Sequence, residues 1–170
     1  DLEKNAIKVV AQFKKMDISH FQRVNNERLV FDSEDKSVAP GDTAFWPGLY
    51  AANRDGSNYI QLVDARGDMT IEHHVGPKLL PPNTYLVKQV GRQDSDEVYV
   101  TSQKLTQSNP PELEHVSLLR LNTLTGRTEG FQRPGPTREW LLDHQGEPRL
   151  VTPLDKNIQA IHYRDPAEKN

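Results

Sequence analysis

Serine and histidine side chains are the groups in this 170-residue chain that could perform nucleophilic catalysis. An activated serine often stands in a G-x-S-x-G turn, where a sharp strand-to-helix bend exposes its hydroxyl group. None of the serines has this setting, and only Ser57 directly follows a glycine, Gly56, in a predicted turn. We therefore predict no catalytic serine in this chain. The serines are Ser19, Ser33, Ser37, Ser57, Ser95, Ser102, Ser108 and Ser117.

Histidine and carboxylate groups could hold a metal ion. His73 and His74 are adjacent, and consecutive side chains of a strand point to opposite faces, so we expect a polar loop or edge rather than a ligand pair. The segment "DSED" at 32–35 and Asp42 offer carboxylates, but they lack the alternating spacing of a calcium loop. We predict no metal site and no cofactor. The other histidines are isolated in sequence and are expected to be solvated or hydrogen-bonded: His20, His115, His144 and His162.

Three further side chains could contribute to binding. Trp46 in "FWPG" could line a ligand-facing surface, although we expect it to pack at the start of a sheet. Trp140, inside the alternating stretch "REWLLD", is predicted to belong to the core. Arg133 in "QRPGPTR" could face a central channel, which no feature of the sequence decides. No substrate-binding residue is therefore assigned.

Composition excludes several classes of partner. The net charge is −3 and the basic residues are scattered, whereas nucleic-acid binding needs clustered positive charge. No apolar run approaches the roughly 20 residues of a membrane span. The absence of cysteine excludes disulfides and is compatible with any compartment, so the localisation stays open. The chain opens "DLEKNAIKVV" without a leader, and we expect it to belong to a longer polypeptide.

The apolar residues fall in short runs separated by turn residues, which predicts an all-β fold. The stretch 7–13 alternates as a strand would but also fits a helix. Some runs are apolar on both faces, with Leu118 opposing Leu119 and Leu121, so both faces need cover. "DSDE" at 94–97 is predicted to form a hairpin turn whose charges protect a sheet edge. The clearer strand runs are 27–33, 48–53, 58–64, 84–90, 97–103, 117–122, 138–143, 148–152 and 158–163, and the glycine turns are 54–57, 65–68, 123–127 and 144–147.

These runs repeat as strand, turn, strand units. The repeat predicts a partial β-propeller of about two complete four-stranded blades with flanking half-blades, since blades stack on both faces. The alternative is a β-sandwich built from the same strands. The proline-rich connector "GPKLLPPNT" suits an extended link rather than a helix. The predicted single propeller segment 1–170 divides into 1–13 (the end of one blade), 18–64, 84–132, and 137–164 (the start of the next).

Three stretches resemble a known family: "LYAANRDGSNYIQL", "SLLRLNTLTGRTEGF" and "WLLDHQGEPRLV" with "IHYRDP". They are similar to the N-terminal propeller of bacterial prolyl oligopeptidase-family serine peptidases of the dipeptidyl aminopeptidase or acylaminoacyl-peptidase type. The resemblance covers nearly the whole chain, but such motifs also recur in TolB-like and WD-repeat propellers. It implies a catalytic α/β-hydrolase domain outside these residues. The paired glutamates by which the dipeptidyl peptidases hold a substrate amino terminus do not occur here.

The resemblance implies a non-catalytic role, in which the propeller gates the access of short peptides to the hydrolase domain. Two other functions remain open: a stand-alone TolB-like binding or scaffolding propeller, and a β-rich enzyme that acts on glycans through a carboxylate pair. An incomplete propeller also exposes blade faces and edges, so we expect self-association or marginal stability.

Overall fold

The computed structural model describes residues 7–14, 16–34, 46–65, 78–88, 93–155 and 160–165. Within these ranges the chain forms eleven β-strands and no helix, which confirms the all-β prediction. The strands are β1 (Asp17–Arg23), β2 (Arg28–Glu34), β3 (Leu49–Asn53), β4 (Ile60–Val63), β5 (Thr84–Leu86), β6 (Glu97–Leu105), β7 (Leu113–Asn122), β8 (Thr128–Gly130), β9 (Thr137–Leu142), β10 (Pro148–Pro153) and β11 (His162–Tyr163).

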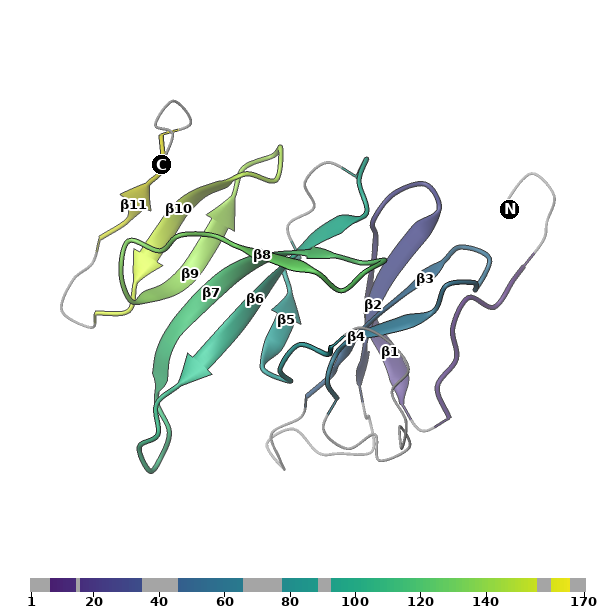
Figure 1. The fold of residues 1–170 in the computed structure, drawn as a ribbon, viewed down its shortest axis with the longest axis horizontal. Coiled ribbons are helices and arrows are strands. Elements are labelled where there is room, and N and C mark those ends of the chain that lie inside the picture. Colours follow the sequence, from purple (N-terminus) through teal and green to yellow (C-terminus); the bar gives the residue numbers. More distant parts are fainter. Residues whose placement is uncertain are drawn as a thin grey trace.

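These strands form three antiparallel sheets, each from one consecutive part of the chain. The first sheet has the order β1-β2-β3-β4, the second β5-β6-β7-β8 and the third β9-β10-β11. Figure 1 shows the sheets following one another across the molecule in chain order, from purple and blue through green to yellow. Within each sheet, every strand thus pairs with the strand before or after it in the chain.

Three of the predicted glycine turns share the same backbone feature, a glycine with a positive φ. Gly56, Gly126 and Gly146 each have a positive φ and close a turn between two antiparallel strands. The residue that opens the last turn, Asp143, accepts hydrogen bonds from the backbone N–H groups of Gln145 and Glu147 at 2.8 and 3.0 Å. Such side-chain acceptors and left-handed glycines favour tight turns, so the local sequence determines them. The turn predicted at 65–68 extends outside the described residues.

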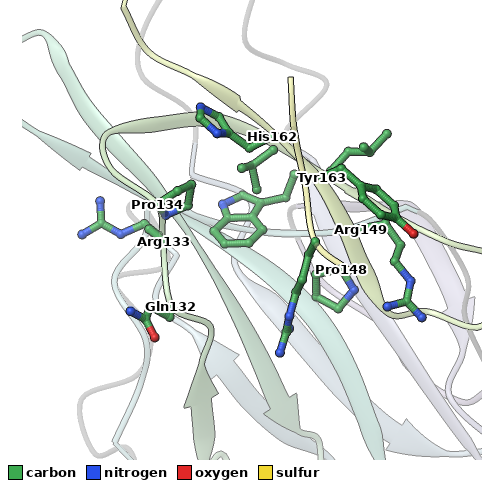
Figure 2. A pocket seen from close by; sticks show the side chains of 11 residues that line it. Gln132, Arg133, Pro134, Pro148, Arg149, His162 and Tyr163 are labelled. Carbon is green, nitrogen blue, oxygen red and sulfur yellow. The ribbon is translucent and has the colours of Figure 1, made fainter. Parts of the chain in front are cut away.

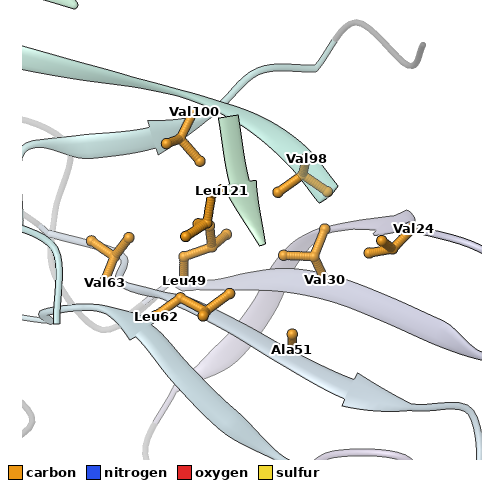
Figure 3. Packing of buried hydrophobic residues seen from close by; sticks show 9 residues of the cluster. All are labelled: Val24, Val30, Leu49, Ala51, Leu62, Val63, Val98, Val100 and Leu121. Atoms are coloured by element: carbon orange, nitrogen blue, oxygen red, sulfur yellow. The ribbon is translucent and has the colours of Figure 1, made fainter. Parts of the chain in front are cut away.

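The largest hydrophobic cluster lies between the first and second sheets. Val30, Leu49 and Leu62 of the first sheet pack with Val100 and Leu121 of the second, all almost completely buried. Figure 3 shows these side chains meeting between the two layers, together with their neighbours in the cluster. Burial of this kind is worth about 1.5–3 kcal/mol for each large aliphatic side chain, which makes the contact a principal stabilising element.

A second cluster joins the second and third sheets. Val116 and Leu118 of β7 pack against Trp140 and Leu142 of β9 and Val151 of β10. In the same strand, Leu121 belongs to the cluster with the first sheet. The prediction that Leu118 and Leu121 point to opposite, covered faces is therefore confirmed. Trp140 is only 9% exposed, which confirms its assignment to the core.

Within residues 7–13, Val10, Ala11 and Phe13 cover the other face of the first sheet, and the segment forms neither a strand nor a helix. Phe13 contacts the rings of Phe31 and Tyr50, with centroids 6.3 and 4.9 Å away. The apolar pattern of this segment fits both a strand and a helix, and the described residues 7–13 form neither. The pattern instead reflects side-chain contact of Val10, Ala11 and Phe13 with the sheet face, which needs no hydrogen-bonded partner strand.

Some strand boundaries differ from the predicted runs. β7 begins at Leu113, well before the predicted start at 117, and its added residues pair with the end of β6, with charged side chains along this part of the ladder. Lys104 Nζ, for example, lies 3.3 Å from Glu114 Oε1. β5 and β11 are shorter than the runs 84–90 and 158–163, parts of which lie outside the described residues.

Candidate functional site

The first candidate site, called the His20 site, lies between the first and second sheets and consists of Ser19, His20, Asp32 and Lys88. Ser19 and His20 are on β1 and Asp32 is on β2. Lys88 follows β5, so the site joins residues of two sheets. They line a hollow of about 280 Å³. The remaining lining residues are Ser33, Glu34, Pro47, Gly48, Tyr85 and Leu86.

Hydrogen bonds orient the His20 imidazole. The backbone N–H of His20 donates to Asp32 Oδ1 at 2.7 Å, and its Nδ1 lies 3.3 Å from both carboxylate oxygens. Ser19 Oγ lies 3.1 Å from the same Nδ1, and Lys88 Nζ lies 3.2 Å from Nε2. Because an ammonium group can only donate, the Lys88 contact requires Nε2 to accept and leaves the ring proton on Nδ1, toward Asp32.

Ser19, His20 and Asp32 are the residue types of a catalytic triad, but their geometry is not that of one. In a triad the serine meets Nε2 and the carboxylate meets Nδ1, so that the ring can take the serine proton. Here Ser19 and Asp32 both contact Nδ1, and Lys88 contacts Nε2 on the opposite side of the ring. The arrangement can bind polar or charged groups, and it does not activate Ser19 as a nucleophile.

The second candidate site, called the arginine pocket, lies between the 132–134 segment and the third sheet. Its volume is about 310 Å³. Figure 2 shows Gln132, Arg133 and Pro134 on one side and Pro148, Arg149 and Tyr163 on the other. The pocket is lined by Gln132, Arg133, Pro134, Trp140, Pro148, Arg149, Leu150, Val151, His162, Tyr163 and Arg164.

Hydrogen bonds hold the inner wall of the arginine pocket in place. Trp140 Nε1 donates to the backbone carbonyl of Val116 at 2.8 Å, and Thr137 Oγ1 donates to the same oxygen at 2.6 Å. Arg149 Nε donates to Asp143 Oδ2 at 2.8 Å. This carboxylate has a lowered pKa, chiefly because it accepts the backbone N–H of Glu147 and also because of the Arg149 side chain.

Arg133 and Arg164 differ from Arg149 in their surroundings. In the part of the chain that the structure describes, no carboxylate pairs with either of them. Arg133 also affects His115. The pKa of His115 is lowered chiefly by burial and, second, by the positive charge of Arg133. The pocket therefore has two guanidinium groups that are not neutralised by described residues.

The structure separates the other predicted candidates. His162 lines the arginine pocket, whereas His144 is exposed in the β9–β10 turn and His115 lies beside Glu114, with Nδ1 and Oε1 3.5 Å apart. Trp46 is half-buried shortly before β3 and is not among the lining residues of either site. His73, His74 and Asp42 lie outside the described residues.

The sequence indicates single members of the two sites but not their grouping. In the sequence, His20 is an isolated histidine and Arg133 is a residue that could face a channel, and no pattern points to Lys88 or Arg164. Lys88 is 68 positions from His20 in the chain. No spacing motif links residues that far apart, so only the packing of the sheets brings them together.

A metal site and a membrane-spanning helix each have requirements with which the described residues can be compared. No group of three or more histidine, aspartate or glutamate residues there is placed to hold a metal ion. Among the same residues, no helix has the length and apolar character needed to cross a membrane. Comparisons with models of protein families, with curated proteins and with solved structures found no match.

Proposed function

We propose that this chain is a segment of a β-propeller whose three sheets are successive blades. The support is the packing: each sheet is a meander of consecutive strands, and hydrophobic clusters lie between the first and second and between the second and third sheets. A sandwich has two sheets, whereas three follow one another here. The first blade contains β1–β4, the second β5–β8, and the third β9–β11.

The proposed role is non-catalytic: the propeller gates the access of short peptides to an α/β-hydrolase domain, as in the prolyl oligopeptidase family. The observation that carries this proposal is the His20–Lys88 contact. It places charged groups between the first strand of one sheet and the end of the first strand of the next. In a propeller of this order, such strands border the central channel. Polar groups there would contact a passing peptide.

Two features support binding rather than chemistry. The Ser19–His20–Asp32 geometry does not activate the serine hydroxyl, for the reason given above. The strand β1 is largely exposed and carries Phe21, which is 76% exposed. An exposed aromatic residue beside charged groups suits contact with a mixed polar and apolar ligand such as a peptide.

The first test is to sequence the gene on both sides of the segment that encodes these residues. We expect further strand–turn–strand repeats and, beyond them, a G-x-S-x-G motif followed by aspartate and histidine. Repeats without the motif would contradict the peptidase role and favour the TolB-like binding module. The absence of further repeats would contradict the propeller itself.

The second test addresses gating in the full-length polypeptide. Replacing Lys88 with alanine removes the charge next to His20 and should change the relative kcat/KM for short peptides of different length and charge. The matched control is replacement of Lys104 with alanine. Lys104 lies on β6 and pairs with Glu114 of β7, and it is not part of the His20 site. Equal effects of the two substitutions on every peptide would contradict a channel role for the His20 site.

A further inference from the structure

We propose that the arginine pocket binds a small organic carboxylate that carries an apolar group. The proposal does not depend on the propeller or on peptide gating, because the pocket is built by the third sheet and the 132–134 segment that precedes it. It concerns the ligand class that this pocket recognises.

The charge of the pocket favours an anion. Arg133, Arg149 and Arg164 line it, and none of the lining residues is an aspartate or glutamate. Asp143 neutralises Arg149 from outside, while Arg133 and Arg164 have no carboxylate partner among the described residues. A guanidinium group presents paired N–H donors that match the two oxygens of a carboxylate.

The walls of the pocket favour an organic ligand over a bare inorganic anion. Pro134 and Pro148 stand on opposite sides, as Figure 2 shows, and Trp140 and Val151 contribute apolar surface. Trp140 is 9% exposed and its indole N–H already donates to Val116, so the small exposed part of this side chain is available for apolar contact only. A volume of about 310 Å³ is at the small end of ligand sites, which suits a molecule of the size of an acylated amino acid.

The arginines place positive charge on two sides of the pocket. The backbone N–H of Arg164 donates to the carbonyl of Arg149 at 2.8 Å, so these two residues lie side by side where β10 and β11 pair. Arg133 stands across the pocket from Arg149. A carboxylate held by Arg133 or Arg164 would leave its apolar group against Pro134, Pro148 and Trp140.

The test uses calorimetric titration of the intact chain at low salt and neutral pH. The probes are N-acetyl-L-phenylalanine, its uncharged amide and inorganic phosphate. We expect saturable binding of the acid and at least tenfold weaker binding of the amide, because the amide lacks the charge-assisted hydrogen bonds. Binding of acid and amide with equal affinity, or of no probe at millimolar concentration, would overturn the proposal. Phosphate that binds as well as the acid would overturn the assignment to an organic carboxylate.

Substitutions locate the binding. Arg133→Gln and Arg164→Gln should each weaken binding of the acid about fivefold or more, and the double variant should abolish it. Arg127→Gln is the matched control: it removes the same charge from the exposed β7–β8 turn and should stay within about twofold of the wild type. In a Trp46→Phe background, the remaining indole N–H resonance reports on Trp140 directly. A ligand that binds without shifting this resonance, or equal weakening in the Arg127 control, would show that the pocket is not the site.

Discussion

Arg28 on β2 and Thr123 at the β7–β8 turn join the first and second sheets through a buried pair of hydrogen bonds. Arg28 Nε donates to Thr123 Oγ1 at 3.0 Å, and Nη2 donates to the Thr123 carbonyl at 2.6 Å. Nη1 donates to Asn53 Oδ1 and to the Asn58 carbonyl, so each of the three guanidinium nitrogens has an acceptor. The side chain is only 2% exposed, and burial lowers its pKa while the charge of Asp96 opposes this.

The first prediction concerns this contact between sheets. Arg28→Met removes donors from buried acceptors and should lower the free energy of unfolding by about 2–4 kcal/mol. Urea denaturation followed by circular dichroism measures the loss. Arg54→Met is the control, because the Arg54–Glu27 pair is exposed and should contribute less than about 1 kcal/mol. Equal stability of the two variants would show that the Arg28 contacts do not hold the sheets together.

The second prediction concerns the Val116 carbonyl, which accepts from both Thr137 Oγ1 and Trp140 Nε1. Thr137→Val or Trp140→Phe leaves one donor in place and should cost about 1 kcal/mol from the lost bond. Removing both leaves the side of the carbonyl toward the third sheet without a donor. The double variant should therefore lose more than the sum of the single losses, by about 0.5 kcal/mol or more in a double-mutant cycle. Strict additivity would mean that the two donors act independently.

The third prediction concerns pH. Burial and the charge of Arg133 lower the pKa of His115, so the folded chain binds its proton less readily than the unfolded chain, where the pKa is about 6.5. Between the folded and unfolded values the unfolded state holds more protons. The stability contributed by neutral His115 is therefore present above pH of about 6.5 and decreases as the pH falls toward the folded pKa.

This pH effect can be measured at a single residue. The imidazole resonances of His115 should titrate below pH of about 6.5, and Arg133→Gln should raise that midpoint. His115→Gln should lose less stability than the wild type between pH 7.5 and pH 5.5. Arg127→Gln should leave its midpoint unchanged, because Arg127 is not among the charges that act on His115. A midpoint that does not respond to Arg133→Gln would contradict the electrostatic contact.

The fourth prediction concerns association between copies. Leu141, Leu150 and Tyr163 share one face of the third sheet through direct strand pairing, and Tyr163 is 65% exposed. Residues 10–13 cover the outer face of the first sheet. By analogy, we expect a second copy of this chain to cover the Leu141–Leu150–Tyr163 face of the third sheet. The molar mass measured by light scattering should therefore rise with concentration.

Leu141→Glu tests this association alone, because Leu150 and Tyr163 also border the arginine pocket. It should shift the chain toward the monomer, whereas Leu124→Glu in the β7–β8 turn, where Leu124 is 44% exposed, should not. A wild-type chain that stays monomeric at high concentration and unfolds cooperatively would contradict the prediction.

The sequence alone determined the strands and turns whose causes are local. The glycines at 56, 126 and 146 allow the positive φ of their turns, and alternation assigned Leu118 and Leu121 to opposite faces. These features depend on neighbouring residues, which is why a single sequence predicts them. At 7–13 the apolar pattern fits both a strand and a helix, and neither forms, because these side chains contact the face of an existing sheet instead.

The tertiary structure decided which polar side chains are buried and which ones meet. No pattern in the sequence marks Arg28 as buried, yet it is 2% exposed and donates to Thr123, 95 positions away. Likewise, Lys88 meets His20, and Arg133 shares a pocket with Arg164, only after the sheets have packed. Hydrogen bonding and charge depend on distance in space, and the order of residues in the chain does not specify that distance until the fold has formed.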